Sequence, residues 1–363
     1  MTRISSKQAS PRQRRRPSAV TIHDVAARAG VSVATVSRVI NRKALVREET
    51  SRHVLAVAQS MKYVPNVAAR SLSIRRSHTI GVVLPDVHGD FFSEVIRGID
   101  SAARKASFHI LVSGSHSDRN EMLEVLDAMH GRVDALIVMA PDVSIAALNE
   151  QLPSNLPLVL LNSTAADRDT LTIDNYGGAA AMMAHLYALG HRRIAFIKGP
   201  HANADARERL RGYRTFARRD ASMQTRELEG DFTEHSGYDA VRSALGAGRM
   251  PQAIFAANDS MAVGAMSALA EAGLTVPGDV AISGFDDIPI ARFVAPPLTT
   301  IRVDIEELGR RAFETVFLAI DQPVRRRPVR ERLPTSLIVR KSCGAHIHQS
   351  NPVERQQIRR RNA

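Results

Sequence analysis

The sequence is short of cysteine, of long apolar runs and of the motifs of common enzymes. Cys343 is the one cysteine in 363 residues, which excludes an internal disulfide and indicates a reducing cytosol. No stretch approaches the uninterrupted apolar length of a membrane span, and the Arg-rich residues 3–16 have no apolar run behind them. We therefore expect a soluble cytoplasmic protein with no membrane partner.

Catalytic and metal-binding signals are also missing. No glycine-rich phosphate loop follows an expected strand, and no Gly-x-Ser-x-Gly motif occurs. The cluster CGAHIH at 343–348 has metal-binding residue types, but no second half accompanies it. We expect no enzymatic activity, no metal and no cofactor.

Charge, by contrast, is abundant and unevenly distributed. Residues 1–80 contain 16 Lys and Arg against 3 Asp and Glu, and residues 325–363 contain 11 against 2. Residues 81–324 are acidic, with 22 against 32. A basic N-terminal end on an acidic body predicts a head that binds a polyanion. Residues 1–19 are expected to form a disordered basic arm, and residues 341–363 a solvated basic tail.

Residues 20–63 are predicted to form three short helices. The stretch GVSVATVSRVIN, 30–41, is rich in β-branched residues, yet its apolar residues have helical spacing. Thr21 with Asp24 resembles a capping box, Gly30 ends the first helix, and Ser32 caps the second. A third helix is expected at about 48–61. The faces expected to pack together are Ile22, Val25, Ala26, Ala29, Val36, Val39, Ile40, Val54, Leu55, Ala58 and Met61.

The other face of the second helix carries small, hydroxyl and basic groups and no acid: Val33, Ala34, Thr35, Ser37, Arg38 and Asn41. Small apolar groups contact thymine methyls, hydroxyls bind phosphates, and Arg binds guanine. An ordinary solvent face is the alternative, but such a face usually carries Glu and Lys. The pattern therefore favours a helix-turn-helix that reads DNA.

From Thr79 onward, short apolar runs alternate with amphipathic segments, which indicates parallel sheets covered by helices on both faces. Strands are expected at 79–85, 108–114, 133–140, 156–162, 192–199, 252–257 and 279–285. Helices are expected at 91–106, 119–131, 176–190, 204–219, 234–246 and 259–273. We expect two similar α/β lobes, built on 79–162 and 192–285, followed by a strand at 299–302 and a helix at 304–320.

Ligands of open parallel sheets bind at the carboxyl ends of the strands. In this sequence those ends carry carboxylates, amides and the pair Phe91–Phe92. Such groups favour a neutral, hydroxyl-rich ligand held between the lobes.

The segment VTIHDVAARAGVSVATVSRVIN, 20–41, resembles the N-terminal signature of the lactose-repressor/purine-repressor (LacI/GalR) family of bacterial transcription regulators. YVPNVAARSL, 63–72, resembles the hinge region of that family, and the resemblance extends to about residue 340. It implies an all-α helix-turn-helix head at 20–63 and a hinge helix or linker at 64–78. It also implies an effector-binding and dimerisation body at 79–340, made of two Rossmann-like lobes as in periplasmic binding proteins.

The resemblance assigns DNA contacts to matching positions. It implies base reading by Val33, Ala34 and Arg38, and phosphate contacts by Thr21, Thr35 and Ser37. It also implies minor-groove binding by the hinge residues Asn66, Ala68, Ala69 and Leu72, with Leu72 as the inserted wedge.

Effector contacts are implied in the same way for Asp90, Phe92, Asp174, Arg209, Asn258 and Asp286. Gly89–Asp90 departs from the Asn-Pro that many members have before Phe-Phe, and so places an extra carboxylate beside the pocket. The expected function is a homodimeric repressor that binds a pseudo-palindromic DNA operator and a carbohydrate effector. Two alternatives remain: a sugar-binding protein without a DNA role, and a regulator with a purine-type co-repressor.

Overall fold

The computed structural model describes residues 20–40, 46–63, 76–116, 118–139, 150, 152–153, 155–163, 165, 167–248, 250–322 and 327–345. The chain divides into two compact units, Met1–Ser77 and His78–Ala363, which we call the head and the body. The predicted basic arm, most of the predicted hinge and residues 346–363 of the predicted tail lie outside the described residues.

The head consists of α1 (Ile22–Ala29), α2 (Val33–Ile40) and α3 (Glu48–Ser60), as the helical spacing predicted. Its buried core is drawn from all three helices: Val25, Ala26, Ala29, Val36, Val39, Val54 and Ala58. Leu55 was predicted to join this core, and that prediction is wrong. Its side chain is 52% exposed because Val54, one position earlier on α3, occupies the buried face.

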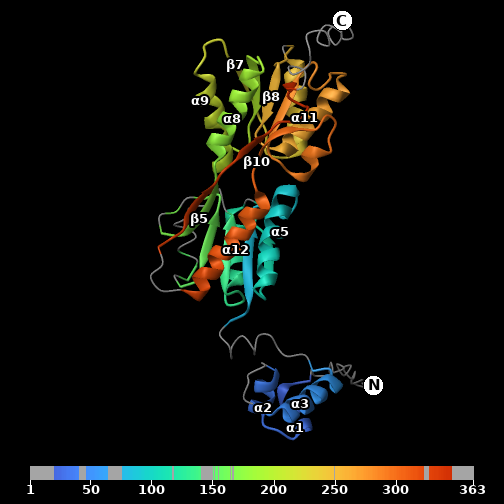
Figure 1. The fold of residues 1–363 in the computed structure, drawn as a ribbon, viewed down its shortest axis with the longest axis vertical. Coiled ribbons are helices and arrows are strands. Elements are labelled where there is room, and N and C mark those ends of the chain that lie inside the picture. The colour runs from blue at the N-terminus through green and yellow to red at the C-terminus, as the bar shows by residue number, and fades with distance from the viewer. Residues whose placement is uncertain are drawn as a thin grey trace, which may run out of the picture. The chain divides into compact units, whose positions relative to one another are not determined.

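One lobe of the body, lobe 1, has a parallel sheet with the strand order β11–β5–β4–β3–β1–β2 (Figure 1). Its helix α6 (Arg119–Met129) packs on one sheet face, through Met122 and Leu126. Helices α5 (Asp90–Lys105) and α12 (Ile305–Asp321) pack on the opposite face. The strands are β1 (Thr79–Leu84), β2 (His109–Gly114), β3 (Ala135–Met139), β4 (Leu158–Leu161), β5 (Asp169–Ile173) and β11 (Arg330–Leu333).

The other lobe, lobe 2, has the order β12–β10–β9–β8–β6–β7, in which only the β10–β12 pair is antiparallel. Phe285 of β9 faces α8 (Asn175–Ala188), whereas Gly284 faces α11 (Asp259–Glu271) on the opposite side. The remaining helices are α9 (Ala204–Ala217), beside α8, and α10 (Glu234–Gly246), beside α11. The strands are β6 (Arg193–Ile197), β7 (Gln224–Leu228), β8 (Ala253–Ala256), β9 (Ala281–Asp286), β10 (Thr299–Arg302) and β12 (Ser336–Ile338).

The chain crosses between the lobes three times in its described part. It leaves β5 at Asp174 to enter α8, leaves β10 at Val303 to enter α12, and passes from β11 to β12. Since β5 and β10 both leave their sheets at their carboxyl ends, the carboxyl ends of both parallel sheets face the junction of the lobes. The expected two-lobed architecture is confirmed, but the last strand and helix divide between the lobes instead of following them.

Several strands were not predicted: β5, β7, β11 and β12. Strands β7, β11 and β12 lie at sheet edges, and β7 (QTREL) and β11 (RERL) carry charged side chains that break the apolar pattern. Residues 341–345, predicted as the start of the tail, pack on lobe 2, with Ser342 and Cys343 fully buried. Within the described residues, no helix has the length and apolar character needed to cross a bilayer.

Candidate DNA interface and effector site

Local hydrogen bonds fix the position of α2 in the head. Thr21 and Asp24 form a reciprocal capping box at the start of α1. Gly30 ends that helix with φ of 65°, a left-handed conformation that glycine adopts without strain. The Ser32 hydroxyl then accepts a hydrogen bond from the Thr35 amide at 3.1 Å, which caps α2. The predicted capping and turn residues are confirmed.

The face of α2 opposite the core presents the predicted groups to solvent. Ala34 and Arg38 are exposed, and Thr35 and Ser37 are partly exposed. Val33 is half-buried against the head core, so only part of its side chain is available to a ligand. The helix carries no acidic residue. A polyanion can therefore approach this face without meeting a negative charge. Asn41 and the hinge residues 66, 68, 69 and 72 lie outside the described residues.

Arg209 is the centre of a polar network in lobe 2. Its buried guanidinium, 3% exposed as a residue, donates to the Asn175 side-chain oxygen at 2.8 Å and to the Ala257 carbonyl at 2.6 Å. It also forms an ion pair with Asp286 at 2.9 Å and stacks on Phe285, 3.8 Å from the ring centroid. The structure thus brings the predicted pair Arg209 and Asp286 together at the carboxyl edge of the sheet.

Burial sets the direction in which the pKa values of the acids in this network shift. It raises the pKa of Asp286, and the neighbouring Arg209 opposes that shift. Asp205, in the first turn of α9, accepts a hydrogen bond from the Asn175 amide at 2.7 Å. Burial raises the pKa of Asp205 to about 6, against the attraction of Arg209. Burial also raises the pKa of Asp259, which accepts from the Thr300 hydroxyl at 2.6 Å.

Two predicted effector residues cap helices. The Asn258 side-chain oxygen accepts from the Met261 amide at 2.9 Å, and its amide group donates to the Phe232 carbonyl. Asp174 caps α8 by accepting from the Gly177 amide at 3.1 Å. These bonds hold both side chains at the carboxyl edges of β8 and β5, with part of their polar atoms already engaged.

In lobe 1, the predicted residues Asp90 and Phe92 lie in the first turn of α5. Gly89 precedes them with φ of 86°, so the Gly–Asp departure from Asn-Pro coincides with a backbone conformation that favours glycine. Phe91 and Phe92 meet edge to face with centroids 5.6 Å apart. Both rings are half-buried and pack on the body core.

Asn162 is one of the strand-end amides that the sequence was expected to place beside a ligand. It follows β4 with φ of 53° and is 4% exposed. Its side-chain oxygen is buried and has no hydrogen-bond partner among the described residues. Buried acceptors are normally paired, so an orphan at the lobe junction indicates a place for a ligand donor.

The sequence analysis missed Asn175 and Asp205. Both stand in the first turn of a helix that follows a strand, within TIDN and NADA, and that position was the available signal. Cys343 of the CGAHIH cluster is buried, with its sulfur 3.4 Å from Nε2 of His185. The described residues contain no group of His, Cys, Asp and Glu arranged to hold a metal ion.

The fold and these two surfaces define a class: a helix-turn-helix head joined to a two-lobed ligand-binding body. Comparison with known proteins agrees. The model for "Bacterial regulatory proteins, lacI family" matches residues 21–66, and that for "Periplasmic binding protein-like domain" matches residues 183–343.

Two curated relatives illustrate the match over most of the chain. The ribose operon repressor of Escherichia coli is 37% identical over 312 residues, which cover 84% of this chain and 94% of that protein. The regulator GalR of Escherichia coli is 35% identical over 309 residues, which cover 83% and 89%. The chain therefore belongs to the lacI family of bacterial regulatory proteins.

Solved structures agree with this assignment. The lac repressor dimer bound to operator and the anti-inducer ONPF superposes with a TM-score of 0.81 at 32% identity, over 90% of this chain and 99% of that one. A lacI-family regulator from Enterococcus faecium with bound ribose gives a TM-score of 0.67 at 29% identity, over 73% and 98%.

Proposed function

We propose that this protein is a bacterial transcription repressor whose affinity for operator DNA is controlled by a sugar bound between the lobes. Relatives named as a ribose operon repressor and as the HTH-type transcriptional regulator GalR support this proposal. Operator DNA lies in the bacterial cytoplasm, so the protein acts there. It works by binding and not by turnover.

The head reads DNA through α2. In the proposed complex α2 enters the major groove, where Arg38 donates a forked pair of hydrogen bonds to guanine. Ala34 and the exposed part of Val33 contact base edges, including thymine methyl groups. Thr21, Thr35 and Ser37 donate hydroxyl hydrogen bonds to phosphates and fix the register of the helix.

The hinge completes the DNA contacts. Ala68 and Ala69 are small enough for two hinge helices to pack closely, and the sequence signature assigns Asn66 a minor-groove contact as well. Leu72 then enters the minor groove, where an apolar side chain unstacks a base step and bends the duplex. These roles rest on the sequence signature at 63–72.

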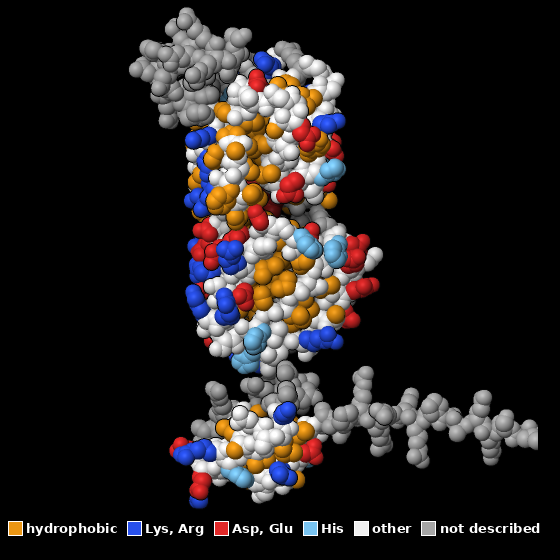
Figure 2. Space-filling view, turned by 90° about the vertical axis from the view of Figure 1, so that its right-hand side faces the viewer, with side chains coloured by type: hydrophobic (Ala, Val, Ile, Leu, Met, Phe, Trp, Pro, Cys, Tyr) orange, Lys and Arg blue, Asp and Glu red, His pale blue; other side chains and the backbone are white. Residues whose placement is uncertain are grey.

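The proposal includes a homodimer, because two heads related by two-fold symmetry match a pseudo-palindromic operator. Figure 2 shows hydrophobic side chains gathered on both lobes, on the side of the body where α5 and α11 lie. Exposed large apolar residues occur on both lobes, among them Leu111 at 40% and Phe293 at 79% exposure. Such surface is typical of a protein that buries it against a second copy.

The effector binds at the lobe junction. Sugar hydroxyls both donate and accept hydrogen bonds, which matches a site that offers the Arg209 guanidinium and the carboxylates of Asp90, Asp205 and Asp286. The orphan oxygen of Asn162 accepts from one hydroxyl in this arrangement. Phe92 covers an apolar face of the ring, and Asp174 and Asn258 line the edge.

The effector site and the DNA-binding head are coupled through the three crossings between the lobes. A sugar that contacts both lobes favours one lobe arrangement, and the heads and hinges reach the operator only in some arrangements. The difference in sugar affinity between those arrangements is the coupling free energy, and it acts equally in both directions.

One observation carries the proposal: a single chain combines the acid-free exposed face of α2 with the buried Arg209–Asp286 pair at the lobe junction. The test is a mobility-shift assay on DNA upstream of the gene, at a stated salt concentration, because the basic arm adds non-specific affinity. We expect a sequence-preferring complex that Arg38→Ala weakens. Absence of sequence preference, or indifference to Arg38→Ala, would contradict it and favour a sugar-binding protein without a DNA role.

A further inference from the structure

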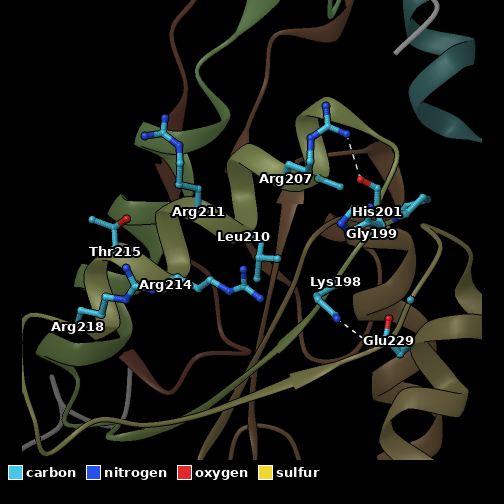
Figure 3. A pocket seen from close by; sticks show the side chains of 13 residues that line it. Lys198, Gly199, His201, Arg207, Leu210, Arg211, Arg214, Thr215, Arg218 and Glu229 are labelled. Carbon is cyan, nitrogen blue, oxygen red and sulfur yellow. Dashed lines mark hydrogen bonds and ion pairs between the residues drawn. The ribbon is translucent and has the colours of Figure 1, made fainter. Parts of the chain in front are cut away.

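A hollow in lobe 2 lies between α9 and the segments that follow β6 and β7. It has a volume of about 470 Å³ and is lined by basic side chains of α9 and of the strand β6 end (Figure 3). We call it the basic hollow and define it by six of its residues: Lys198, Arg207, Arg211, Arg214, Arg218 and Glu229. The four arginines recur at intervals of three or four residues, which places them on one face of the helix. Arg209, on the inward face, is not part of it.

The acids around the basic hollow compensate only part of its charge. Arg214 pairs with Glu227 at 2.7 Å, Lys198 pairs with Glu229 at 2.7 Å, and Arg211 pairs with a glutamate one turn earlier. Glu229 is 90% exposed, whereas Glu227, which accepts two hydrogen bonds from Arg214, is only 28% exposed. The exposed Lys198–Glu229 pair contributes little, so a doubly charged anion can displace Glu229.

Two of the arginines, Arg207 and Arg218, form no ion pair with an acid among the described residues. Arg207 donates to the backbone carbonyls of His201 and Ala202, which carry no net charge. Arg218, exposed at the end of α9, forms no ion pair within the described part of the chain. Eleven helical positions separate them, or about 16 Å along the axis. That separation exceeds the length of a hexose phosphate, so a ligand held at Arg218 feels Arg207 only through long-range attraction.

The neighbouring hollow has the opposite charge. Its volume is about 590 Å³, and it is lined by the acids Glu227, Glu229, Asp231 and Asp239 with one arginine, Arg226. The two hollows share Glu229 and Gly230. An anion near this surface is therefore attracted to one hollow and repelled by the other.

We propose that the basic hollow binds a small phosphorylated metabolite such as a sugar phosphate, as a second ligand separate from the effector at the lobe junction. Arg214 and Arg218 hold the phosphate, because a guanidinium matches phosphate oxygens with two parallel hydrogen bonds. Thr215, between them on α9, supplies a hydroxyl (Figure 3). Leu210 forms the apolar wall against which the carbon skeleton packs, and Arg207 attracts the ligand from the far end.

The test is a calorimetric titration of the full-length protein with glucose 6-phosphate, inorganic phosphate and glucose at constant ionic strength. We expect glucose 6-phosphate to bind saturably and Arg218→Gln to weaken this binding about fivefold to tenfold, as for loss of one charge-assisted contact. Arg219→Gln is the matched control, because Arg219 is the next residue but lies over Phe216 and outside the hollow. The Arg219→Gln variant should bind glucose 6-phosphate with the same affinity as the wild type.

A variant with the opposite effect makes the test decisive. Glu229→Gln removes the exposed acid that pairs with Lys198, so it should strengthen binding of glucose 6-phosphate several-fold. Any binding of glucose, which lacks the phosphate, should respond to neither variant. The proposal is overturned if glucose 6-phosphate does not bind saturably, or if Arg218→Gln and Glu229→Gln both leave its affinity unchanged. Equal affinity for inorganic phosphate would overturn the assignment to a sugar phosphate, because the carbon skeleton would then contribute nothing.

Discussion

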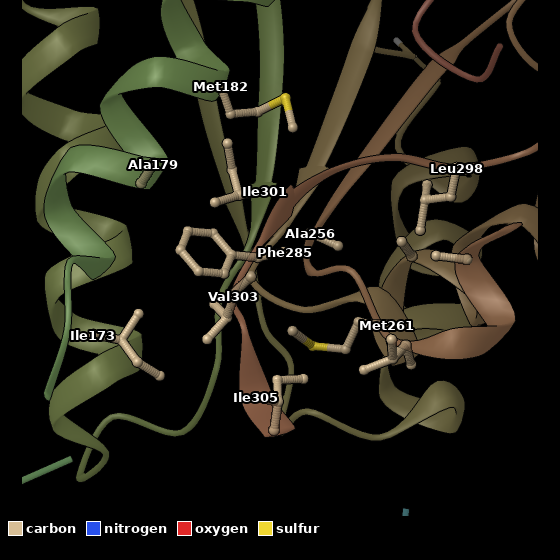
Figure 4. Packing of buried hydrophobic residues seen from close by; sticks show 14 of the residues in the cluster. Ile173, Ala179, Met182, Ala256, Met261, Phe285, Leu298, Ile301, Val303 and Ile305 are labelled. Atoms are coloured by element: carbon tan, nitrogen blue, oxygen red, sulfur yellow. The ribbon is translucent and has the colours of Figure 1, made fainter. Parts of the chain in front are cut away.

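The head and the body place their proposed binding residues in opposite surroundings. In the head, Val36 and Val39 form the core side of α2 while Ala34 and Arg38 face solvent. In the body, Arg209 and Asp286 are buried at the sheet edge. The ring of Phe285 lies under the Arg209 guanidinium within a core that spans both lobes (Figure 4). On α2, the residues that stabilise the fold are thus different from those proposed to bind DNA. In the effector network, the same residues do both.

The largest expected effect is in the body. Arg209→Gln removes the cation that pairs with buried Asp286 and should lower the free energy of unfolding by about 3–5 kcal/mol, because it leaves an uncompensated acid. Urea unfolding followed by circular dichroism measures the change. Arg211→Gln, on the exposed side of the same helix, is the control and should cost less than about 0.5 kcal/mol.

A second substitution tests the cause of that loss. Adding Asp286→Asn to Arg209→Gln removes the unpaired carboxylate and should recover part of the lost stability. If the double variant is as unstable as the sum of both single variants, the ion pair is not the source of the effect.

In the head, the expected effect is on binding alone. Arg38→Ala should weaken operator binding by about 1–3 kcal/mol and relax sequence preference at one base position. Its unfolding free energy should stay within about 0.5 kcal/mol of the wild type, because Arg38 is exposed. Mobility-shift assays measure the operator affinity, and thermal unfolding of the same samples measures the stability. If Arg38→Ala lowers the unfolding free energy as much as it lowers the free energy of operator binding, the residues of α2 do not separate folding from binding.

The body should also respond to pH through Asp205. Burial raises its pKa to about 6 in the folded protein, so the folded state binds more protons than the unfolded state between about pH 4 and 6. Stability from this residue therefore increases as pH falls from 7.5 to 5, by about 1 kcal/mol. Asp205→Asn should remove that increment in urea unfolding at the two pH values. An unchanged difference between the two pH values would contradict the assignment.

The smallest stability effect is expected at Asn162, which has an unpaired oxygen and should therefore separate binding from folding within the body. Asn162→Gly keeps the left-handed backbone accessible and removes that oxygen. We expect effector affinity to fall by about 1 kcal/mol, the net contribution of one hydrogen bond, with little loss of stability. Calorimetric titration measures the affinity. Unaltered affinity would show that the oxygen does not contact the ligand.

The head was more predictable than the body because its signals are local. Thr21, Gly30 and Ser32 act on neighbouring residues, so their roles follow from sequence distance alone. Helical spacing also outweighed the β-branched composition of α2, because Val36 and Val39 reach the same core. Leu55 was assigned wrongly since its neighbour Val54 satisfies nearly the same spacing.

In the body, the missing information is long-range. Strands β7 and β11 carry charges at sheet edges and show no apolar pattern. The Arg209 network joins residues as far apart as 175 and 286, and their proximity is decided by sheet order. The resemblance to a family supplied Arg209, and the strand ends of the sequence pointed to Asn162 and Asp286. Asn175 and Asp205 emerged only from the folded chain.

The central claim is that the effector network and the DNA face of α2 belong to one coupled system. A thermal-shift screen with sugars, sugar acids and purines first identifies a ligand that stabilises the body. The decisive measurement is then the operator dissociation constant with and without that ligand, for the wild type and for Asp286→Asn. We predict a change of at least about fivefold for the wild type, within the usual range of coupling free energies, and a much smaller change for the variant. An operator affinity that is identical with and without a saturating ligand would contradict the account.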